Sequence, residues 1–583
     1  MVKDEIAQVI QRATGEENIH LQIPEIDEYG DYSTNLALQL FSKPQKGKVS
    51  KFKNPRELAE EIVKKLSKDK KLLKIVSKIE VAGPGFINFW LATFVLITEL
   101  KEVFSKGDDY GKSDILKGKR IMVEYGQPNT HKLPHIGHLF SYIYGESLVR
   151  LLQASGAQVF RANYQGDVGP HVAKCLWALL KEKSDVPADL SEKTDLLQKM
   201  YQLGSNAYEK DPKAKIEIDQ LNVRIYSEDK SLLDVWRKTR KWSLDYYKGF
   251  EKRLGIKYDR AFFESEVHKK GKRVIEENIG TIFKQSRGAV IFEGGKYGLH
   301  DRVFLTRLAT PTYEAKDIYL QKLKMKMWPF DLQIITTANE QNEYFKVIFK
   351  ALELLDPIFE GKLKHIGFGM VQLKSGKISS RKGRIIGAVE LIDVTIDEIK
   401  KIVVQRADLD GREKERVAEV VGVGAVKYSF LKTNPLKDIK FEFQESISRE
   451  GNSGPYLQYT YARTRSVLRK FENSVSSTSK IQNFNVKHLN SEEMSLLRSF
   501  PRFSDVVSDA QDNYSPNILC NYLYDLAQKF NTFYNAHRIL DDKSKKEDEF
   551  KKRRDFRLAL TVSTGQILKN GLNLLGIQAP EKM

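Results

Sequence analysis

Residues 121–164, IMVEYGQPNTHKLPHIGHLFSYIYGESLVRLLQASGAQVFRANY, decide the fold of this chain. The apolar run Ile121–Tyr125 predicts a strand, and apolar residues at helical spacing predict a helix through Leu139–Leu152. After a glycine, the run Val159–Tyr164 predicts a second strand. A strand, a helix and a second strand in this order are the unit from which parallel α/β sheets are built.

Two histidines and a glycine stand at the start of the predicted helix, as His135-Ile136-Gly137-His138. The first turn of a helix presents unpaired N–H groups and the positive end of its dipole, which suits a phosphate. Imidazoles can add hydrogen bonds to phosphate charge, and Gly137 allows a flat base to approach the backbone. The segment therefore predicts a nucleotide site. A metal site, for which no third ligand lies in local register, and ordinary surface histidines are the alternatives.

Composition narrows the class of protein. At 583 residues the chain exceeds what one hydrophobic core supports, so several domains are expected. The formal net charge of +19 indicates a polyanionic partner such as nucleic acid, although a lysine-rich surface alone also makes a chain basic. Cys175 and Cys520 are too few for a disulfide framework or a cysteine zinc site. With no apolar run of bilayer length and a charged N-terminus, we expect a cytoplasmic protein without a membrane partner.

The pattern along the chain predicts a multidomain α/β protein with three domains. Residues 1–107 predict an α+β domain with a turn at Gly83-Pro84-Gly85. Residues 108–400 predict a parallel α/β domain, whose sheet resumes after residue 288 and which carries a helical insertion at about 175–275. Residues 401–583 predict an α-helical domain.

A second segment with chemical character is Met370–Arg384, MVQLKSGKISSRKGR. Its cations are interleaved with glycine and serine, which predicts a mobile basic loop. Such a loop can close over a triphosphate and offset charge as pyrophosphate leaves. An ordinary solvated turn has the same composition, but the pairing with the histidine segment in one α/β fold favours the nucleotide role.

This pairing resembles the HIGH and KMSKS motifs of the class I aminoacyl-tRNA synthetases. The surrounding residues resemble one family of that class, the arginyl-tRNA synthetases, in the family's order and over nearly the whole chain. The segments that carry the resemblance are Gly30–Asn35, Gly83–Phe86, Pro128–His138, Asn163–Gly169, Thr312–Ile318, Glu340–Phe345, Gly454–Tyr459 with Ala462-Arg463, and Leu575–Met583. Two positions depart from the family pattern: Ser380 stands at the second lysine of KMSKS, and Tyr344 stands where a histidine often occurs.

The resemblance implies a Rossmann-type catalytic core with a parallel sheet, an N-terminal α+β domain that contacts tRNA, and a C-terminal α-helical bundle domain. It implies that the anticodon-binding region begins at about residue 450. The implied activity is arginine–tRNA ligation, in which L-arginine and ATP form arginyl-adenylate and pyrophosphate before arginine is transferred to the 3′ end of tRNA(Arg). ATP is expected with Mg²⁺, without zinc, and arginine activation is expected to need bound tRNA. We expect a monomer.

In this chemistry the arginine carboxylate attacks the α-phosphate of ATP in line, so catalysis depends on positioning and charge stabilisation. The resemblance assigns catalytic roles at the two motifs to His135, His138, Lys132, Lys377 and Lys382. It assigns ATP contacts to His135, Gly137, His138, Met370, Val371, Lys377 and Arg381. Because of Ser380, the choice among Lys377, Arg381 and Lys382 as the clamp on the leaving pyrophosphate stays open. No dedicated metal ligands are expected.

A guanidinium substrate needs carboxylates placed for forked hydrogen bonds, with neutral acceptors around them. The family segments assign this pocket to Glu124, Asn129, Tyr313, Asp317 and Gln341. Each residue also has an ordinary alternative role. Glu124 is otherwise a surface acid at a strand end, Tyr313 a core aromatic and Asp317 a helix cap.

Aromatic and cationic side chains that can stack on bases and bind phosphates are the tRNA-binding candidates. They are Phe86 in the N-terminal domain and Tyr459, Arg463, Tyr534 and Arg538 in the C-terminal domain. Aromatic residues at helical spacing are usually core, so about half of the aromatic and cationic residues of these C-terminal helices are expected to be buried.

Three other functions are alternatives to this one. A synthetase for another amino acid is disfavoured by the arginine-pocket residues. An RNA-binding protein without ligase activity is disfavoured by the intact histidines and Lys377. A small-molecule adenylyltransferase is disfavoured by the chain length and the helical, basic C-terminal region.

Overall fold

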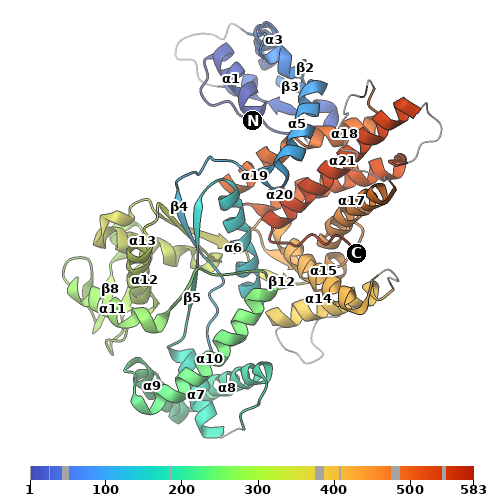
Figure 1. Ribbon diagram of the computed structural model, residues 1–583. Helices are drawn as coiled ribbons and strands as arrows, with labels where there is room; N and C mark the ends of the chain where they lie inside the picture. Colours follow the sequence, from blue (N-terminus) through green and yellow to red (C-terminus); the bar gives the residue numbers. More distant parts are fainter. Residues whose placement is uncertain are drawn as a thin grey trace.

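The computed structural model describes residues 2–24, 26–42, 52–182, 185–374, 387–405, 409–474, 486, 488–540 and 547–583. Figure 1 shows an N-terminal unit in blue beside the C-terminal helices in red, with a central sheet and a separate group of helices, α7–α10, at the opposite end.

The N-terminal unit is built on an antiparallel sheet of three strands in the order β1-β3-β2. The elements of this unit are β1 (Tyr32–Thr34), β2 (Val76–Ala82), β3 (Phe86–Leu91), α1 (Val2–Thr14), α2 (Leu36–Ser42), α3 (Pro55–Leu66), α4 (Leu72–Ile75) and α5 (Thr93–Lys106). Gly83 and Gly85 have φ values of 53° and 138° between β2 and β3, so the predicted glycine turn is confirmed.

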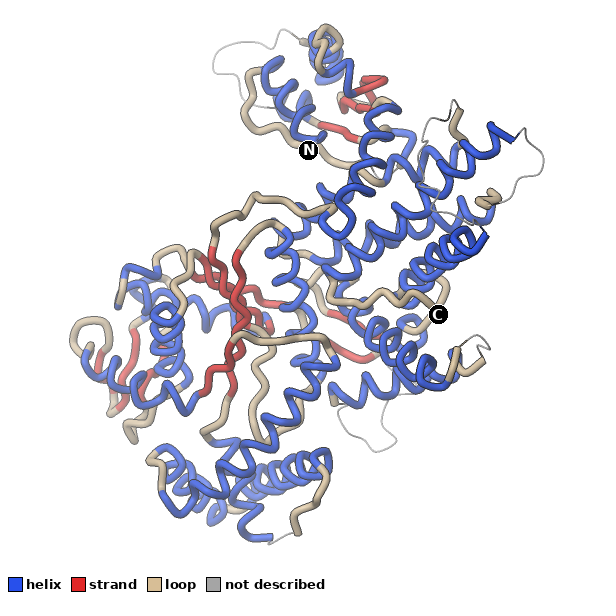
Figure 2. The backbone as a smooth tube through the Cα atoms, viewed as in Figure 1, coloured by secondary structure: helices blue, strands red, loops and turns tan. Residues whose placement is uncertain are grey.

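A parallel sheet of five strands, in the order β11-β10-β4-β5-β6, forms the centre of the molecule. The strands are β4 (Arg120–Glu124), β5 (Gln158–Gln165), β6 (Arg260–Phe263), β10 (Leu332–Ala338) and β11 (Leu363–Phe368). Figure 2 shows helices on both sides of these strands. The strand–helix–strand prediction for residues 121–164 is confirmed. Since the chain leaves β4 first toward β5 and later resumes at β10, the carboxyl end of β4 is the topological switch point, where such folds bind ligands.

Helix α6 (Ile136–Ala154) follows β4 and is buried on nearly every side, with 14 of its 19 residues buried. Gly145 allows it to lie close to the sheet, because a Cβ there would come within 2.2 Å of the Tyr125 ring. On the other side, the Tyr144 hydroxyl donates to the Tyr514 carbonyl at 2.8 Å. This helix therefore connects the sheet to the C-terminal helices.

The predicted helical insertion lies between β5 and β6. Its helices are α7 (Pro170–Glu182), α8 (Leu190–Lys210), α9 (Pro212–Tyr226) and α10 (Lys230–Arg253). Small apolar clusters of their own hold these helices together, for example Leu176, Ile218 and Leu232. The insertion is thus a packed unit and not an extended loop.

The parallel sheet resumes after residue 288 as predicted, at β10 and β11. Two small sheets were not predicted. In the first, β7 (Lys284–Ser286), β8 (Ala289–Phe292) and β9 (Arg302–Leu305) form a separate antiparallel sheet. Its first hairpin turns through Arg287 and Gly288, with φ values of 50° and 82°, and two consecutive positive φ values are what a two-residue hairpin needs. The region after residue 401 is not wholly helical, because β13 (Ile439–Phe441) pairs with β12 (Val371–Leu373).

Helices make up most of the remaining structure. Beside the sheet lie α11 (Glu264–Glu277), α12 (Tyr313–Met327) and α13 (Asn342–Leu355). The C-terminal helices are α14 (Ala388–Val403), α15 (Gly411–Leu431), α16 (Phe443–Ser446), α17 (Gly454–Ser474), α18 (Ser491–Ser499), α19 (Arg502–Asp512), α20 (Pro516–Ala536) and α21 (Glu547–Leu574). Within the ranges that the structure describes, no helix is long and apolar enough to cross a membrane.

Buried charges join the N-terminal unit to α18–α20. The Arg498 guanidinium donates to Asp31 at 2.7 Å, and both side chains are largely buried. The Tyr32 hydroxyl donates to Asp505 at 2.8 Å, and the Lys529 ammonium lies 3.1 Å from Asp27. These contacts fix the N-terminal unit on the C-terminal helices.

Candidate active site

The two histidines of the HIGH segment bind each other's backbone at the start of α6. His135 is the N-cap residue, and its Nδ1 accepts the N–H groups of Gly137 at 3.1 Å and His138 at 3.4 Å. His138 Nδ1 in turn accepts the His135 N–H at 3.2 Å. A Cβ at Gly137 would lie 3.0 Å from the His135 ring, so in this structure the glycine makes room for that ring.

These hydrogen bonds also determine where each ring carries its proton. Burial, with the nearby Lys132 charge, lowers the pKa of His135, and burial with the charges of His135 and Lys132 lowers the pKa of His138 to about 3. Both rings are therefore neutral at pH 7. Because each Nδ1 is an acceptor, the proton lies on Nε2, and each ring has an Nε2–H to donate.

The chain that follows the predicted basic loop contacts this helix start. Gly387, the first described residue after the loop, forms a β-bridge with His135, and the Ala388 N–H donates to the Pro134 carbonyl at 2.9 Å. At the other end, Lys374 is hydrogen-bonded through its N–H to the Phe441 carbonyl. The predicted phosphate-binding residues Lys377, Arg381 and Lys382, with Ser380, lie outside the described residues.

The first residues of the predicted loop form a strand instead: Val371 begins β12, and Met370 lies just before it. The Met370 N–H donates to Asp438 at 2.9 Å, the Met370 carbonyl accepts from Ile439, and Val371 pairs with Ile439. Their backbone groups are thus bonded within the protein, and the Met370 side chain is exposed.

Asp317, in the second turn of α12, is the most distinctive carboxylate of the predicted arginine pocket. It is buried and accepts a 2.6 Å hydrogen bond from the Tyr344 hydroxyl. Burial, with a contribution from Glu124, raises the pKa of Asp317 to about 7, although the Tyr344 hydrogen bond and Lys324 lower it. Among the residues that the structure describes, Asp317 has no cation within ion-pair distance. Its position inside the helix makes the helix-cap alternative wrong.

Glu124 ends β4 inside the protein, so the surface-acid alternative is wrong. One carboxylate oxygen forms an ion pair with Lys324, which is fully buried, and the other accepts from the Gln127 amide at 3.1 Å. A second buried pair lies nearby, where the Lys316 ammonium donates to Glu264 at 2.7 Å. Two of these three buried carboxylates, Glu124 and Glu264, thus have a lysine partner. The third, Asp317, has no cation within ion-pair distance among the described residues.

Tyr313 and Gln341 lie at helix starts next to these charges. Tyr313 begins α12 and is 53% exposed, so it is not a core residue, and the Lys316 ammonium lies 4.3 Å from its ring centre. Gln341 ends the short helix η4 (Asn339–Gln341) and is exposed at the start of α13. Both side chains are accessible to a ligand.

Sequence reasoning missed Tyr164. Its hydroxyl on β5 is buried and has no hydrogen-bond partner among the described residues. Burial raises its pKa well above the usual value, and the negative charges of Glu264 and Asp317 raise it further. Sequence analysis also left Glu264, Lys316 and Lys324 unassigned. For the two lysines, the available signal was the presence of charged residues at core-facing positions of α12.

Asn129 and Lys132 lie between β4 and α6. Asn129 bridges Gly166 on the neighbouring segment, and a Cβ at Gly166 would come within 2.2 Å of the Asn129 side-chain oxygen. The Lys132 ammonium lies 4.2 Å from the ring centre of Tyr201 in α8.

The structure brings together three of the predicted tRNA-binding residues. The Arg463 guanidinium lies 4.9 Å from the ring centres of both Tyr459 and Tyr534. Arg538 is exposed just beyond α20, and Phe86 is partly buried in the N-terminal sheet. About half of nine aromatic and cationic residues of the C-terminal helices were expected to be buried: Tyr456, Tyr459, Tyr461, Arg463, Arg465, Phe530, Phe533, Tyr534 and Arg538. Only three of the nine are buried, Tyr461, Phe530 and Phe533, so fewer are buried than predicted.

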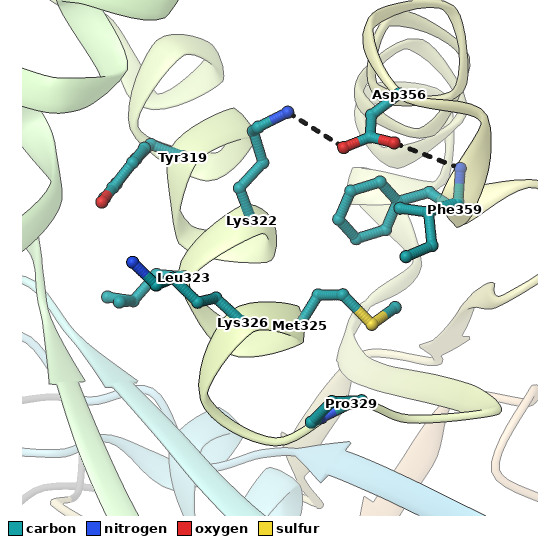
Figure 3. Close-up of a pocket in the computed structure, with 9 residues that line it drawn as sticks. Tyr319, Lys322, Leu323, Met325, Lys326, Pro329, Asp356 and Phe359 are labelled. Carbon is teal, nitrogen blue, oxygen red and sulfur yellow. Dashed lines mark hydrogen bonds and ion pairs between the residues drawn. The ribbon is translucent and has the colours of Figure 1, made fainter.

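Two other cavities lie away from the predicted site residues. Figure 3 shows one of about 530 Å³ lined by the far half of α12, including Lys322 and Met325, and by Asp356 and Phe359. Lys322 and Asp356 pair with each other there at 3.2 Å. Among the described residues, no group of three or more His, Cys, Asp or Glu side chains is arranged to hold a metal ion.

Comparisons with known proteins extend over the whole chain. Family models match at residues 1–91 (arginyl tRNA synthetase N terminal domain), 99–443 (tRNA synthetases class I (R), catalytic domain) and 457–583 (DALR anticodon binding domain). An arginine–tRNA ligase of Treponema denticola is 33% identical over 582 residues, covering 97% of this chain and 95% of that protein. One from Porphyromonas gingivalis is 32% identical over 532 residues, covering 87% and 88%.

Solved structures show the same fold. The arginyl-tRNA synthetase of Thermus thermophilus matches with a TM-score of 0.79 at 24% identity, covering 100% of both chains. That of Plasmodium falciparum matches with a TM-score of 0.79 at 21% identity, covering 100% of this chain and 98% of its own.

Proposed function

The chain belongs to the arginyl-tRNA synthetase family, and from that premise we propose that it is an arginine–tRNA ligase, which activates L-arginine with ATP and transfers it to the 3′ end of tRNA(Arg). The observation that carries the choice of arginine is Asp317. A buried carboxylate without a cation among the described residues, in a pocket where other carboxylates already have lysine partners, matches a substrate side chain with one fixed positive charge.

The arginine side chain is proposed to enter between Asp317 and the accessible residues Tyr313 and Gln341. Tyr344 supports this role by holding the Asp317 carboxylate with a hydrogen bond. Glu124 and Asn129 lie toward the helix start and are proposed for the α-amino and carboxylate end of the substrate. The buried hydroxyl of Tyr164 offers the guanidinium a further neutral acceptor.

ATP is proposed to lie at the start of α6. The Nε2–H groups of His135 and His138 would donate to phosphate oxygens, where negative charge develops as the arginine carboxylate attacks. Lys132 adds a positive charge beside them. Mg²⁺ bound with ATP would be held mainly by phosphate oxygens and would supply further charge neutralisation.

The basic loop is proposed to stabilise the leaving pyrophosphate through Lys377, Arg381 or Lys382. The anchoring of Gly387 beside His135 supports this proposal, because it ties one end of the loop to the ATP-binding helix start. Met370 and Val371 are proposed to contact the adenosine through their side chains, since their backbone groups are already bonded.

We propose that tRNA contacts the N-terminal domain at Phe86 and the C-terminal domain at Tyr459, Arg463, Tyr534 and Arg538. The cluster of Arg463 between two tyrosine rings supports base stacking there. The proposed domains are 1–107, 108–400 and 401–583, and the proposed enzyme is a cytoplasmic monomer.

The deciding experiment is transfer of radiolabelled arginine to total tRNA, with each of the other amino acids as a control. ATP–pyrophosphate exchange with arginine, measured with and without tRNA, then separates activation from transfer. Charging with arginine alone is expected. Charging with another amino acid, or with none, would contradict the proposal.

A further inference from the structure

The segment Asn129–Leu133 joins β4 to α6 and carries two proposed site residues, Asn129 and Lys132. Its backbone is strained, because His131 has a φ of 63°, in the left-handed region that residues with a side chain rarely adopt. Gln127, just before it, has a φ of 45°. Such conformations persist only where the surrounding structure over-determines them. Here the surrounding contacts come from the helical insertion.

One face of α10 contacts this segment through side-chain hydrogen bonds. Polar residues recur every four positions on that face, and all are at most 2% exposed: Thr239, Ser243 and Tyr247. The Ser243 hydroxyl accepts the His131 N–H at 2.9 Å. The Tyr247 hydroxyl lies 2.6 Å from the Asn129 carbonyl and 2.7 Å from the Lys132 carbonyl, so it holds the segment on both sides of His131.

The His131 ring is fixed by hydroxyl groups at both nitrogens. The Thr239 hydroxyl lies 2.8 Å from His131 Nε2, and the Thr130 hydroxyl lies 2.9 Å from Nδ1. Each hydroxyl is also within hydrogen-bond distance of a backbone carbonyl, that of Val235 at 2.8 Å and that of Gly166 at 3.1 Å. Burial lowers the pKa of His131 to about 3, so the ring is neutral at pH 7.

Helix α8 of the same insertion completes the contact. The Gln198 side-chain oxygen accepts the Leu133 N–H at 2.9 Å, and Tyr201 lies against the Lys132 ammonium. The insertion therefore contacts every residue from Asn129 to Leu133 except Thr130, and Thr130 is bound through His131.

We propose that the insertion is a positioning element for the active site, in which Thr239, Ser243 and Tyr247 hold the strained turn that places Asn129 and Lys132. These residues touch no substrate, so they are positioning residues and act through His131 and the turn backbone. The inference rests on the proposed function for its assay, but its subject is the role of the insertion and not the choice of amino acid.

The test uses the full-length enzyme and two matched pairs of variants. Thr239→Val removes the hydroxyl that is hydrogen-bonded to His131 Nε2 but keeps the side-chain shape, whereas Thr239→Ser keeps the hydroxyl. Tyr247→Phe removes the hydroxyl bound to the turn, whereas Tyr246→Phe removes a hydroxyl from the preceding residue of α10. Each is measured for arginine-dependent ATP–pyrophosphate exchange with tRNA present, for kcat and the KM of arginine separately, and for tRNA affinity by filter binding.

Thr239→Val and Tyr247→Phe are expected to lower kcat/KM by about 5- to 100-fold, the equivalent of one buried group left unsatisfied. Thr239→Ser and Tyr246→Phe are expected to stay within about twofold of wild type, and tRNA affinity should not change in any variant. Equal losses within either pair, or full activity of both Thr239→Val and Tyr247→Phe, would overturn the inference. If Thr239→Val does not fold, the tyrosine pair decides. A wild-type enzyme that charges no arginine would contradict the proposed function instead.

Discussion

Replacing Asp317 by asparagine should weaken arginine binding and at the same time stabilise the empty enzyme. Asparagine keeps the size of the side chain and an oxygen that can accept from Tyr344, but it removes the negative charge. A guanidinium left without its partner in a desolvated pocket costs roughly 2–5 kcal/mol, which is about 30- to 5,000-fold in kcat/KM for arginine. The KM for ATP should change little, because the substitution lies away from the helix start.

The effect on stability has the opposite sign. The pKa of Asp317 rises from 3.8 to about 7 in the folded protein, so between these values the folded state binds more protons than the unfolded state. The free energy of unfolding therefore falls as pH rises through this range and then stays level above pH 7. Each tenfold change in the acid dissociation constant corresponds to about 1.4 kcal/mol, so the charged carboxylate destabilises the empty enzyme by up to about 4 kcal/mol at alkaline pH. Asp317→Asn removes this penalty.

Two measurements check this reasoning. Arginine titration of ATP–pyrophosphate exchange, with tRNA present, gives the loss of arginine use. Urea unfolding at pH 6 and pH 8 without arginine gives the stability, and the variant's advantage should be about 1 kcal/mol larger at pH 8. Asp397→Asn, at an exposed position of α14, is the control and should change neither quantity. An unchanged arginine KM, or a variant less stable than wild type at pH 8, would refute the argument.

Three further substitutions test neighbouring contacts. Tyr344→Phe removes a hydrogen bond that lowers the pKa of Asp317, so the arginine KM should rise by about 2- to 10-fold and most strongly below pH 7, as measured by exchange assays across pH. Gly166→Ala places a methyl group within 2.2 Å of the Asn129 side-chain oxygen, so arginine use should fall at least about tenfold while filter binding shows unchanged tRNA affinity. Arg498→Met removes the nearer of the two arginines that pair with the buried Asp31 and leaves Arg502 at 3.7 Å, so urea unfolding should show a loss of about 1–3 kcal/mol.

The parallel core could be predicted because its pattern is local. Apolar runs at Ile121–Tyr125 and Val159–Tyr164, with a helical repeat between them, occur within one stretch of chain. The antiparallel strands β7–β9 were not predicted. Their first turn has Arg287 at a positive φ, a position where glycine or asparagine would have indicated a turn but arginine does not. The pairing of β12 with β13 was not predicted because the two strands are far apart in sequence and only three residues long.

In the proposed arginine pocket, too, contacts between distant parts of the chain could not be predicted. The resemblance pointed to Asp317, but nothing in the sequence says that Lys316, the residue before it, is bound to Glu264. Charge pairs of this kind depend on which helix faces which strand, and that is settled only in the folded chain. Tyr344 stands where the family often has a histidine, which is a departure from the family pattern. In the structure, its hydroxyl donates a hydrogen bond to Asp317.

The burial of α6 has a consequence for how the protein is made. Its Ser147 hydroxyl donates to the Leu574 carbonyl at 3.2 Å, and its Arg150 guanidinium donates to the Asn573 carbonyl at 3.1 Å. A ribosome synthesises these partners more than 400 residues after the helix that needs them. During translation, the apolar surface of α6 is therefore not covered by its final neighbours and is accessible to chaperones and proteases. The start of α6 also gains a neighbour late, because Gly387 forms a bridge with His135. The chain therefore cannot be divided into two halves that fold independently.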